Sequence, residues 1–177
     1  MIAPLSLSNV ITVLLAIACL WTIVPQARGD RVRLWRLALP AAFATAQALV
    51  LLAGVFDATL AHDAEWLGGG LLGGVLGRMR GWTLSFDLDR ARSLIAVRRS
   101  IDVHLAAIGL VAMAAIDFTS AGFEDPVVAT DVVAAGAAFF AGYIACRALA
   151  IAVRVSRFAN ATPQSSTTPA GTSLPPS

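Results

Sequence analysis

Charged side chains are scarce in this sequence, and the shortage excludes most soluble folds. Asp, Glu, Lys and Arg make up 14% of the 177 residues, against about 25% in an average soluble domain. Hydrophobic residues make up 58% even before the 14 glycines are counted. A chain of this length cannot bury so much apolar surface in one core, whereas a bilayer solvates that surface directly. The composition therefore predicts an integral membrane protein.

Lysine is absent, and cysteine is nearly so. All 13 basic residues are arginine and alanine is abundant, a combination that suggests a GC-rich bacterial genome. Cys19 and Cys146 both lie in apolar runs, and the sequence has no CxxC motif or Cys/His cluster. A zinc site or a thioredoxin-like motif is therefore not supported. We interpret both cysteines as small buried side chains.

Catalytic and cofactor motifs are also missing. The sequence shows no Ser/His/Asp arrangement, phosphate-binding loop, nucleotide fingerprint or metal cluster. We therefore expect no enzymatic activity, no cofactor or metal, and no nucleic-acid partner. The internal repeats and matching broken helices of many transporters are not evident either.

The sequence has instead a series of long apolar runs. Met1–Ala27 carries no charged side chain and ends in a poor cleavage site, so we interpret it as a retained helix and not a signal peptide. About 20 apolar residues suffice to cross the ~30 Å hydrocarbon core. We predict an all-α membrane domain over residues 1–155, with five transmembrane helices. Their approximate ranges are 4–25, 37–60, 64–81, 101–121 and 127–153.

A tail over residues 156–177 follows the last predicted helix. It is rich in Ser, Thr and Pro and lacks apolar periodicity, which predicts disorder. Arg147 falls in the last turns of the fifth helix, where we expect its side chain to extend to the membrane interface.

The placement of the arginines predicts the orientation. Arginines enriched in short loops mark the cytoplasmic side of a membrane. With five spans, they fall only in the first loop, the third loop and the C-terminal end. They are Arg28, Arg31, Arg33 and Arg36; then Arg78, Arg80, Arg90, Arg92, Arg98 and Arg99; then Arg147, Arg154 and Arg157. We therefore predict a protein of the bacterial cytoplasmic (inner) membrane with its N-terminus outside and its C-terminus in the cytoplasm.

The third predicted span is the shortest. Its uncharged stretch, Trp66–Gly77, is short for a transmembrane helix, so a re-entrant segment is the alternative. Arg78 and Arg80 can extend its reach by directing their charges to the interface. If this segment did not span, the arginines of the two halves of the chain would lie on opposite sides. Their distribution therefore favours five spans over four.

A polar insert separates the third and fourth predicted helices at residues 82–100. Apolar and polar residues alternate strictly from Trp82 to Asp89, and again at Ile95 and Val97. Such alternation is typical of strands, and it predicts a short cytoplasmic β-hairpin. The alternative is an amphipathic helix, with an apolar face made by Leu84, Leu88, Ala91 and Ile95.

Glycines are regularly spaced in the third predicted helix. Gly69, Gly73 and Gly77 recur every four residues, as do Gly70 and Gly74. Small residues at this spacing let two helix backbones approach closely. We predict a tight helix contact, preferably within the chain, with a contact between two copies as the alternative.

A few polar side chains fall within or at the ends of the predicted spans. Ionisable groups inside membranes are candidates for function. Asp102 and His104 lie near the cytoplasmic boundary, where we expect a solvated or arginine-paired state and not a proton relay or metal site. Gln47 lies mid-span, and we expect it to bind a neighbouring helix.

The order of these features resembles the CcdC-like family of small bacterial membrane proteins. The resemblance covers roughly residues 5–120. It rests on Arg31-Val32-Arg33, Leu39-Pro40, the glycines from Gly68 to Gly77, Asp89-Arg90, and Ile95 and Val97 through Ser100. The family is named for its association with cytochrome c maturation genes, and its members are otherwise of unknown function. The resemblance implies a small multi-pass membrane protein and supplies no catalytic residues.

Three functional hypotheses follow. The first is a non-enzymatic accessory or scaffolding protein, with the lipid bilayer and a membrane protein or a second copy as partners. The second is a small transporter or permeation component, with a path lined by Gln47, Asp57, Asp102 and His104. The third is a thiol-redox helper in cytochrome c maturation, with Cys19 and Cys146 as the reactive pair.

Overall fold

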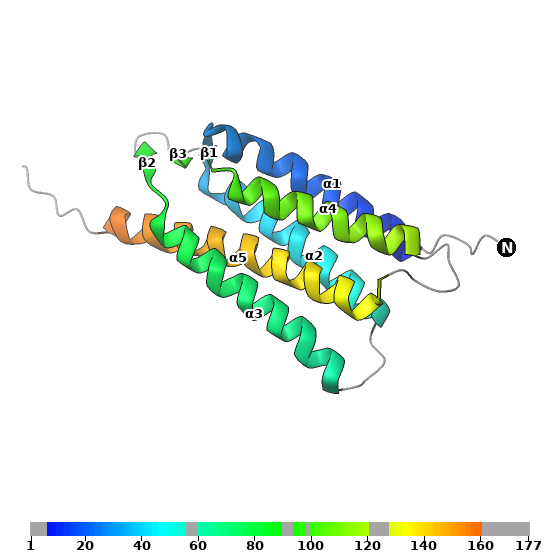
Figure 1. Cartoon of the computed structure of the whole chain (residues 1–177). Helices are drawn as coiled ribbons and strands as arrows, with labels where there is room; N and C mark the ends of the chain where they lie inside the picture. Colours follow the sequence, from blue (N-terminus) through cyan, green and yellow to red (C-terminus); the bar gives the residue numbers. More distant parts are fainter. Residues whose placement is uncertain (1–6, 56–59, 90–93, 98–99, 121–127, 161–177) are drawn as a thin grey trace, which may run out of the picture.

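The computed structural model describes residues 7–55, 60–89, 94–97, 100–120 and 128–160 (Figure 1). It is mostly helical, with one short 3-10 helix and three short strands. In chain order the elements are α1 (Leu7–Arg28), β1 (Arg31–Arg33), η1 (Leu34–Leu37), α2 (Ala38–Val55), α3 (Leu60–Thr83), β2 (Phe86–Asp89), β3 (Leu94–Val97), α4 (Asp102–Ser120) and α5 (Thr130–Asn160).

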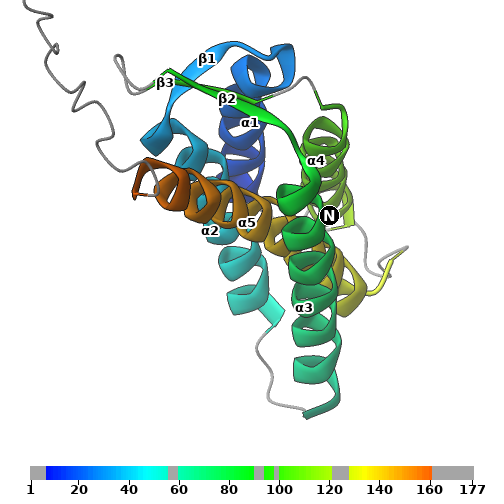
Figure 2. The ribbon, with the colours of Figure 1, turned by 90° about the vertical axis from the view of Figure 1, so that its left-hand side faces the viewer.

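The helices run in alternating directions along the chain (Figure 1). Helices α1, α2, α5 and α4 form a ring in which each contacts the next, and α3 lies outside this ring. The most extensive helix contact is between α3 and α5. Helix α3 is therefore held mainly by α5, and the view from the sheet end shows it on the periphery (Figure 2).

In the part of the chain that the structure describes, four segments are long and apolar enough to cross a membrane: Leu7–Arg28, Leu34–Ala53, Asp102–Ser120 and Thr130–Phe158. This confirms a mostly helical protein with helices suited to a bilayer. The described residues form five α-helices, of which four meet this criterion, so the fifth span stays a prediction. Helix α3 is absent from this group because glycines and terminal charges lower its mean hydropathy.

Three helices extend beyond their predicted ends, and α3 does so at both, since it runs from Leu60 to Thr83 against a predicted 64–81. Helix α1 passes Pro25 and stops at Gly29, which has a positive φ of 80°. The Asp30 and Gly29 amides donate to the Pro25 and Gln26 carbonyls, the paired bonds of a glycine helix stop. Helix α5 continues to Asn160, so the tail predicted from residue 156 begins later than expected. The rest of that tail, residues 161–177, lies outside the described part of the chain.

The three strands form one antiparallel sheet in the order β1-β3-β2. Strands β2 and β3 confirm the predicted hairpin, and the alternative of an amphipathic helix is wrong. The alternation begins later than predicted, because Trp82 and Thr83 still belong to α3. Strand β1 was not predicted. It places Val32 opposite Ile95, and the apolar face of the sheet packs on Ile151 and Val155 of α5.

Candidate functional site

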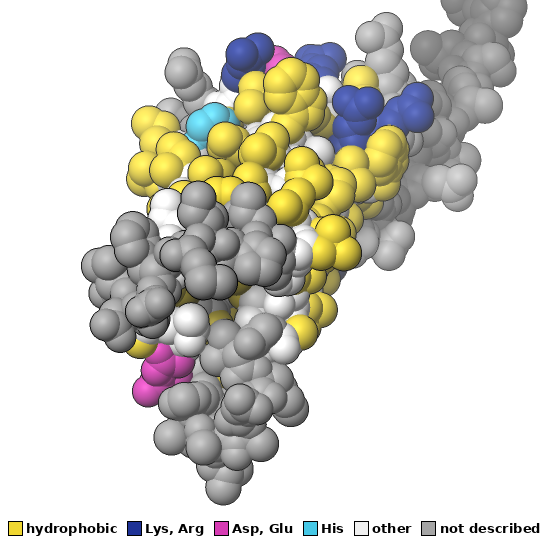
Figure 3. Space-filling model, turned by 90° about the vertical axis from the view of Figure 1, so that its right-hand side faces the viewer, with side chains coloured by type: hydrophobic (Ala, Val, Ile, Leu, Met, Phe, Trp, Pro, Cys, Tyr) yellow, Lys and Arg dark blue, Asp and Glu magenta, His cyan; other side chains and the backbone are white. Residues whose placement is uncertain are grey.

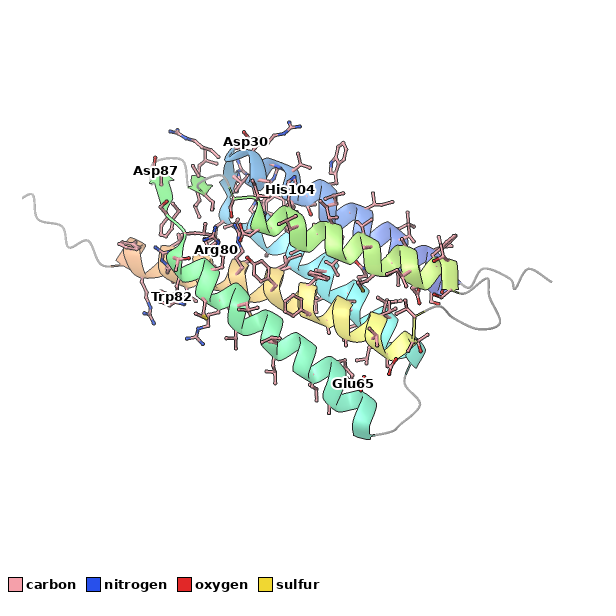
Figure 4. All side chains as sticks on the ribbon, viewed as in Figure 1. Asp30, Glu65, Arg80, Trp82, Asp87 and His104 are labelled. Carbon is pink, nitrogen blue, oxygen red and sulfur yellow. The ribbon has the colours of Figure 1, made fainter. Side chains whose placement is uncertain are left out.

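One end of the bundle, here called the basic end, carries every arginine of the described residues. It is the end formed by the last turns of α1, α3 and α5 and by the sheet. The arginines there are Arg28, Arg31, Arg33, Arg36, Arg78, Arg80, Arg147, Arg154 and Arg157. Arg90, Arg92, Arg98 and Arg99 lie outside the described residues. Figure 4 shows Arg80 and Trp82 at this end and Glu65 at the opposite one.

An ion cluster ties three helices together at the basic end. Asp102, the first residue of α4, directs its Oδ2 atom toward α3 and α5. The Tyr143 hydroxyl donates a 2.5 Å hydrogen bond to this oxygen. Arg147 Nε lies 3.3 Å and Arg80 Nε 3.4 Å from the same atom. The arginine-paired state that we expected for Asp102 is therefore observed.

The members of this cluster differ in burial. The Arg147 side chain is only 4% exposed and the Asp102 side chain 20%, whereas the Arg80 side chain is 49% exposed. The expectation that Arg147 extends to the interface is therefore wrong. It points instead to a counter-charge on a neighbouring helix, because a buried guanidinium without one is very costly.

Several buried polar atoms, either in the cluster or within two residues of Asp102 in the chain, have no hydrogen-bond partner among the described residues. They are Ser100 Oγ, Asp102 Oδ1, His104 Nδ1 and Arg147 Nε. Arg147 Nε is close enough to Asp102 for an ion pair but is not aligned for a hydrogen bond. The described residues contain no group of three or more His, Cys, Asp or Glu side chains that could hold a metal ion. The cluster can therefore accept or donate further hydrogen bonds, to water or to a small polar molecule.

Tyr143 is the member of the cluster that the sequence analysis missed. It is the only tyrosine in the chain, and it precedes Arg147 by one helical turn. Residues four apart share a helix face, so this spacing is a signal that the two side chains meet the same neighbours.

Arg154 fixes the end of α3 and the start of the sheet. Its Nη1 donates to the Gly81 carbonyl at 2.9 Å and to the Leu84 carbonyl at 2.6 Å. The guanidinium also lies 4.8 Å from the centre of the Phe86 ring. A cation at a helix C-terminus stabilises the unpaired carbonyls there. Arg154 therefore has a structural role beyond its predicted part in membrane orientation.

The glycines of α3 lie against the backbone of α5. A methyl group added at Gly69 would come within 2.5 Å of the Ala135 carbonyl oxygen. Methyl groups at Gly73 and Gly77 would clash with the carbonyls of Phe139 and Tyr143. The close approach is therefore within the chain, and it brings the end of α3 beside the residues of the ion cluster.

The other two predicted packing glycines have looser surroundings. A methyl group at Gly70 would meet Ala138 at ordinary contact distance, 3.8 Å or more. One at Gly74 would lie 3.1 Å from Cys146 Sγ, the end of a side chain. The backbone contact therefore depends on Gly69, Gly73 and Gly77, and less on Gly70 and Gly74.

The remaining predicted candidates are not brought together. Gln47 is fully buried, and its Nε2 donates to the Leu110 carbonyl at 3.0 Å, which links α2 to α4 as expected. The Cys19 thiol donates to the Pro40 carbonyl at 3.5 Å, whereas Cys146 faces Gly74. Both cysteines are free thiols. Asp57 lies outside the described residues.

An apolar cavity of about 300 Å³ lies between α2, α3 and α5. Four alanines and Gly142 of α5 line it, together with Leu49 and Leu52 of α2 and Trp66 and Leu71 of α3. None of its lining residues belongs to the ion cluster, so cavity and cluster are separate features.

These features define a class: a helical bundle suited to a bilayer, with a buried ion cluster and a small sheet at one basic end. No family model, curated protein or solved structure matches the chain. The resemblance to the CcdC-like family stays a prediction.

Proposed function

We propose that this chain is a non-enzymatic accessory or scaffolding protein of the bacterial cytoplasmic membrane, with five spans and with its basic end in the cytoplasm. The ion cluster carries this proposal. Asp102, Arg80, Arg147 and Tyr143 engage one another and fasten α3, α4 and α5 at the basic end. Charges used in this way stabilise one arrangement of helices, as a scaffold requires.

The fifth span is supported by the outer face of α3. The helix has 24 residues, which gives a length of about 36 Å. Gly69, Gly73 and Gly77 face α5. The exposed side of the helix is apolar, and four of its side chains are more than half exposed: Leu71, Leu72, Val75 and Met79. Part of the low mean hydropathy of α3 thus arises from glycines that meet α5, and lipid would meet the apolar side.

The orientation is supported by the separation of charge. Arginines gather at the basic end, and arginine-rich loops face the cytoplasm. Figure 3 shows hydrophobic side chains over most of the described surface on one face, with arginines along its upper edge. Exposed apolar side chains bordered by arginines are expected of a protein seated in a membrane.

The transporter hypothesis has less support. It requires Gln47, Asp57, Asp102 and His104 along one path, but Gln47 binds α4 within the α1–α2–α4–α5 core. Asp102 belongs to the separate cluster with α3 and α5. The thiol hypothesis requires two thiols that can react together, whereas Cys19 faces α2 and Cys146 faces α3.

Affinity purification from the native membrane tests the scaffolding proposal. The full chain would carry a tag after Ser177 and be extracted in mild detergent, with mass spectrometry of the proteins that co-purify. We expect a reproducible membrane-protein partner that is lost from an Asp102→Asn variant and retained with Asp87→Asn, an exposed control. Recovery of the chain alone, or only with copies of itself, would contradict the accessory role.

A further inference from the structure

Some of the arginines at the basic end are held by the fold itself, and others are not. Arg80 and Arg147 face Asp102, and Arg154 binds the carbonyls at the end of α3. Arg78 is exposed and has no ion pair or hydrogen bond among the described residues. Arg157 is also exposed, and its contact is with the ring of Trp82, 5.6 Å from its guanidinium carbon.

Arg78, Trp82 and Arg157 form one exposed patch, here called the α3–α5 patch. Arg78 and Trp82 are four residues apart on α3 and therefore share a face. Trp82 is 41% exposed, and Figure 4 shows it at the basic end. The patch combines two guanidinium groups with one indole ring, and no carboxylate of the described residues pairs with it.

We propose that the α3–α5 patch binds the phosphate headgroup of an anionic phospholipid. Guanidinium groups suit phosphate because their planar N–H donors match its oxygens. Tryptophan favours the membrane interface, where its ring meets hydrocarbon and its N–H meets water. The patch supplies both kinds of group at the level where a lipid headgroup lies.

An apolar face for the acyl chain adjoins the patch. Met79 follows Arg78 directly, and exposed Val75 and Leu71 continue along α3 toward its start. Leu71 lies about 10 Å along the helix axis from Arg78, which a single acyl chain can span. The headgroup patch and this apolar face are continuous, and that continuity distinguishes a lipid from a free phosphate. The proposal rests on the proposed embedding of α3 in the bilayer.

Native mass spectrometry of the full chain in non-ionic detergent tests this assignment. The probes are phosphatidylglycerol and phosphatidylcholine with identical acyl chains. In an Arg78→Gln/Arg157→Gln variant we expect phosphatidylglycerol binding to fall about thirtyfold, since each of the two arginines near an anionic headgroup contributes on the order of 1 kcal/mol. Phosphatidylcholine binding should change little. Trp82→Ala should also weaken phosphatidylglycerol binding.

The matched control is Arg28→Gln/Arg33→Gln, which removes the same charge from exposed positions at the same end. If phosphatidylglycerol binding fell equally in both double variants, or in neither, the α3–α5 patch would not be the binding site. If millimolar inorganic phosphate displaced phosphatidylglycerol, the patch would bind phosphate itself, and the assignment to a lipid would be wrong. If reporter fusions showed that α3 does not cross the bilayer, the proposed five-span topology would be wrong, and this inference would fail with it. Correct topology with unchanged lipid binding would refute this inference alone.

Discussion

Tyr143 donates its hydroxyl hydrogen to Asp102 across the contact between α5 and α4, at a distance of 2.5 Å. The same carboxylate oxygen faces Arg80 and Arg147. One oxygen atom thus contacts side chains of two other helices. Substitutions at these side chains should therefore have coupled effects on the free energy of unfolding.

Tyr143→Phe should destabilise the protein by removing one charge-assisted hydrogen bond. Such bonds contribute about 1.5–3 kcal/mol, and phenylalanine keeps the ring packing. The measurement is thermal unfolding in detergent, with Asp102→Asn and the double variant completing a cycle. Side chains in direct contact are coupled by about 0.5 kcal/mol or more. Strictly additive effects would mean that the hydroxyl and the carboxylate do not interact.

Asp102→Asn should cost more than Tyr143→Phe. The substitution leaves Arg147, whose side chain is 4% exposed, without its counter-charge, and breaking a buried pair costs about 3–5 kcal/mol. Unfolding in detergent measures the loss. Adding Arg147→Met should recover part of it, because the unpaired buried charge is then gone. Equal stability of Asp102→Asn and the exposed control Asp87→Asn would show that the cluster contributes nothing.

The sequence predicted best those features that depend on local pattern. The alternation around Ile95 and Val97 identified the hairpin, because a half-buried strand needs residues of period two. Strand β1 escaped prediction because Arg31-Val32-Arg33 contains a single apolar residue. Its place in the sheet depends on pairing with β3, a segment far along the chain.

Features that depend on contacts between distant segments could not be predicted. The last turns of α5 looked like the start of a tail, yet Val155 packs under the sheet and Phe158 packs edge-to-face on Phe86 at 5.7 Å. These contacts hold residues of low apolar periodicity in a helix. The position of Arg147 near a helix end indicated an interfacial side chain. Only the packing of α4 on α5 reveals that Asp102 lies within reach.

The glycine contact gives a prediction with a matched control in the same helix. Gly73→Ala places a methyl group against the Phe139 backbone, which cannot yield as a side chain does. We expect a loss of about 1–3 kcal/mol, the usual cost of overpacking, and a weaker hold on α3. At Gly68 nothing lies within 4 Å of an added methyl group, so Gly68→Ala should be neutral or stabilising. Similar effects of the two substitutions in detergent unfolding would contradict the packing of α3 on α5.

The proposed five spans and the proposed orientation predict the side of the membrane for each end of the chain. A green fluorescent protein fused after Ser177 should fluoresce, because the arginine-rich end stays in the cytoplasm. An alkaline phosphatase fused after Asp57, between α2 and α3, should be active, because that connection lies outside. Phosphatase fused after Ser177 is the control and should be inactive. If α3 did not cross, the chain would have an even number of spans and its two ends would share a side. An active fusion at Asp57 together with an active fusion at Ser177 would therefore exclude a crossing by α3, whatever the apolar character of its outer face.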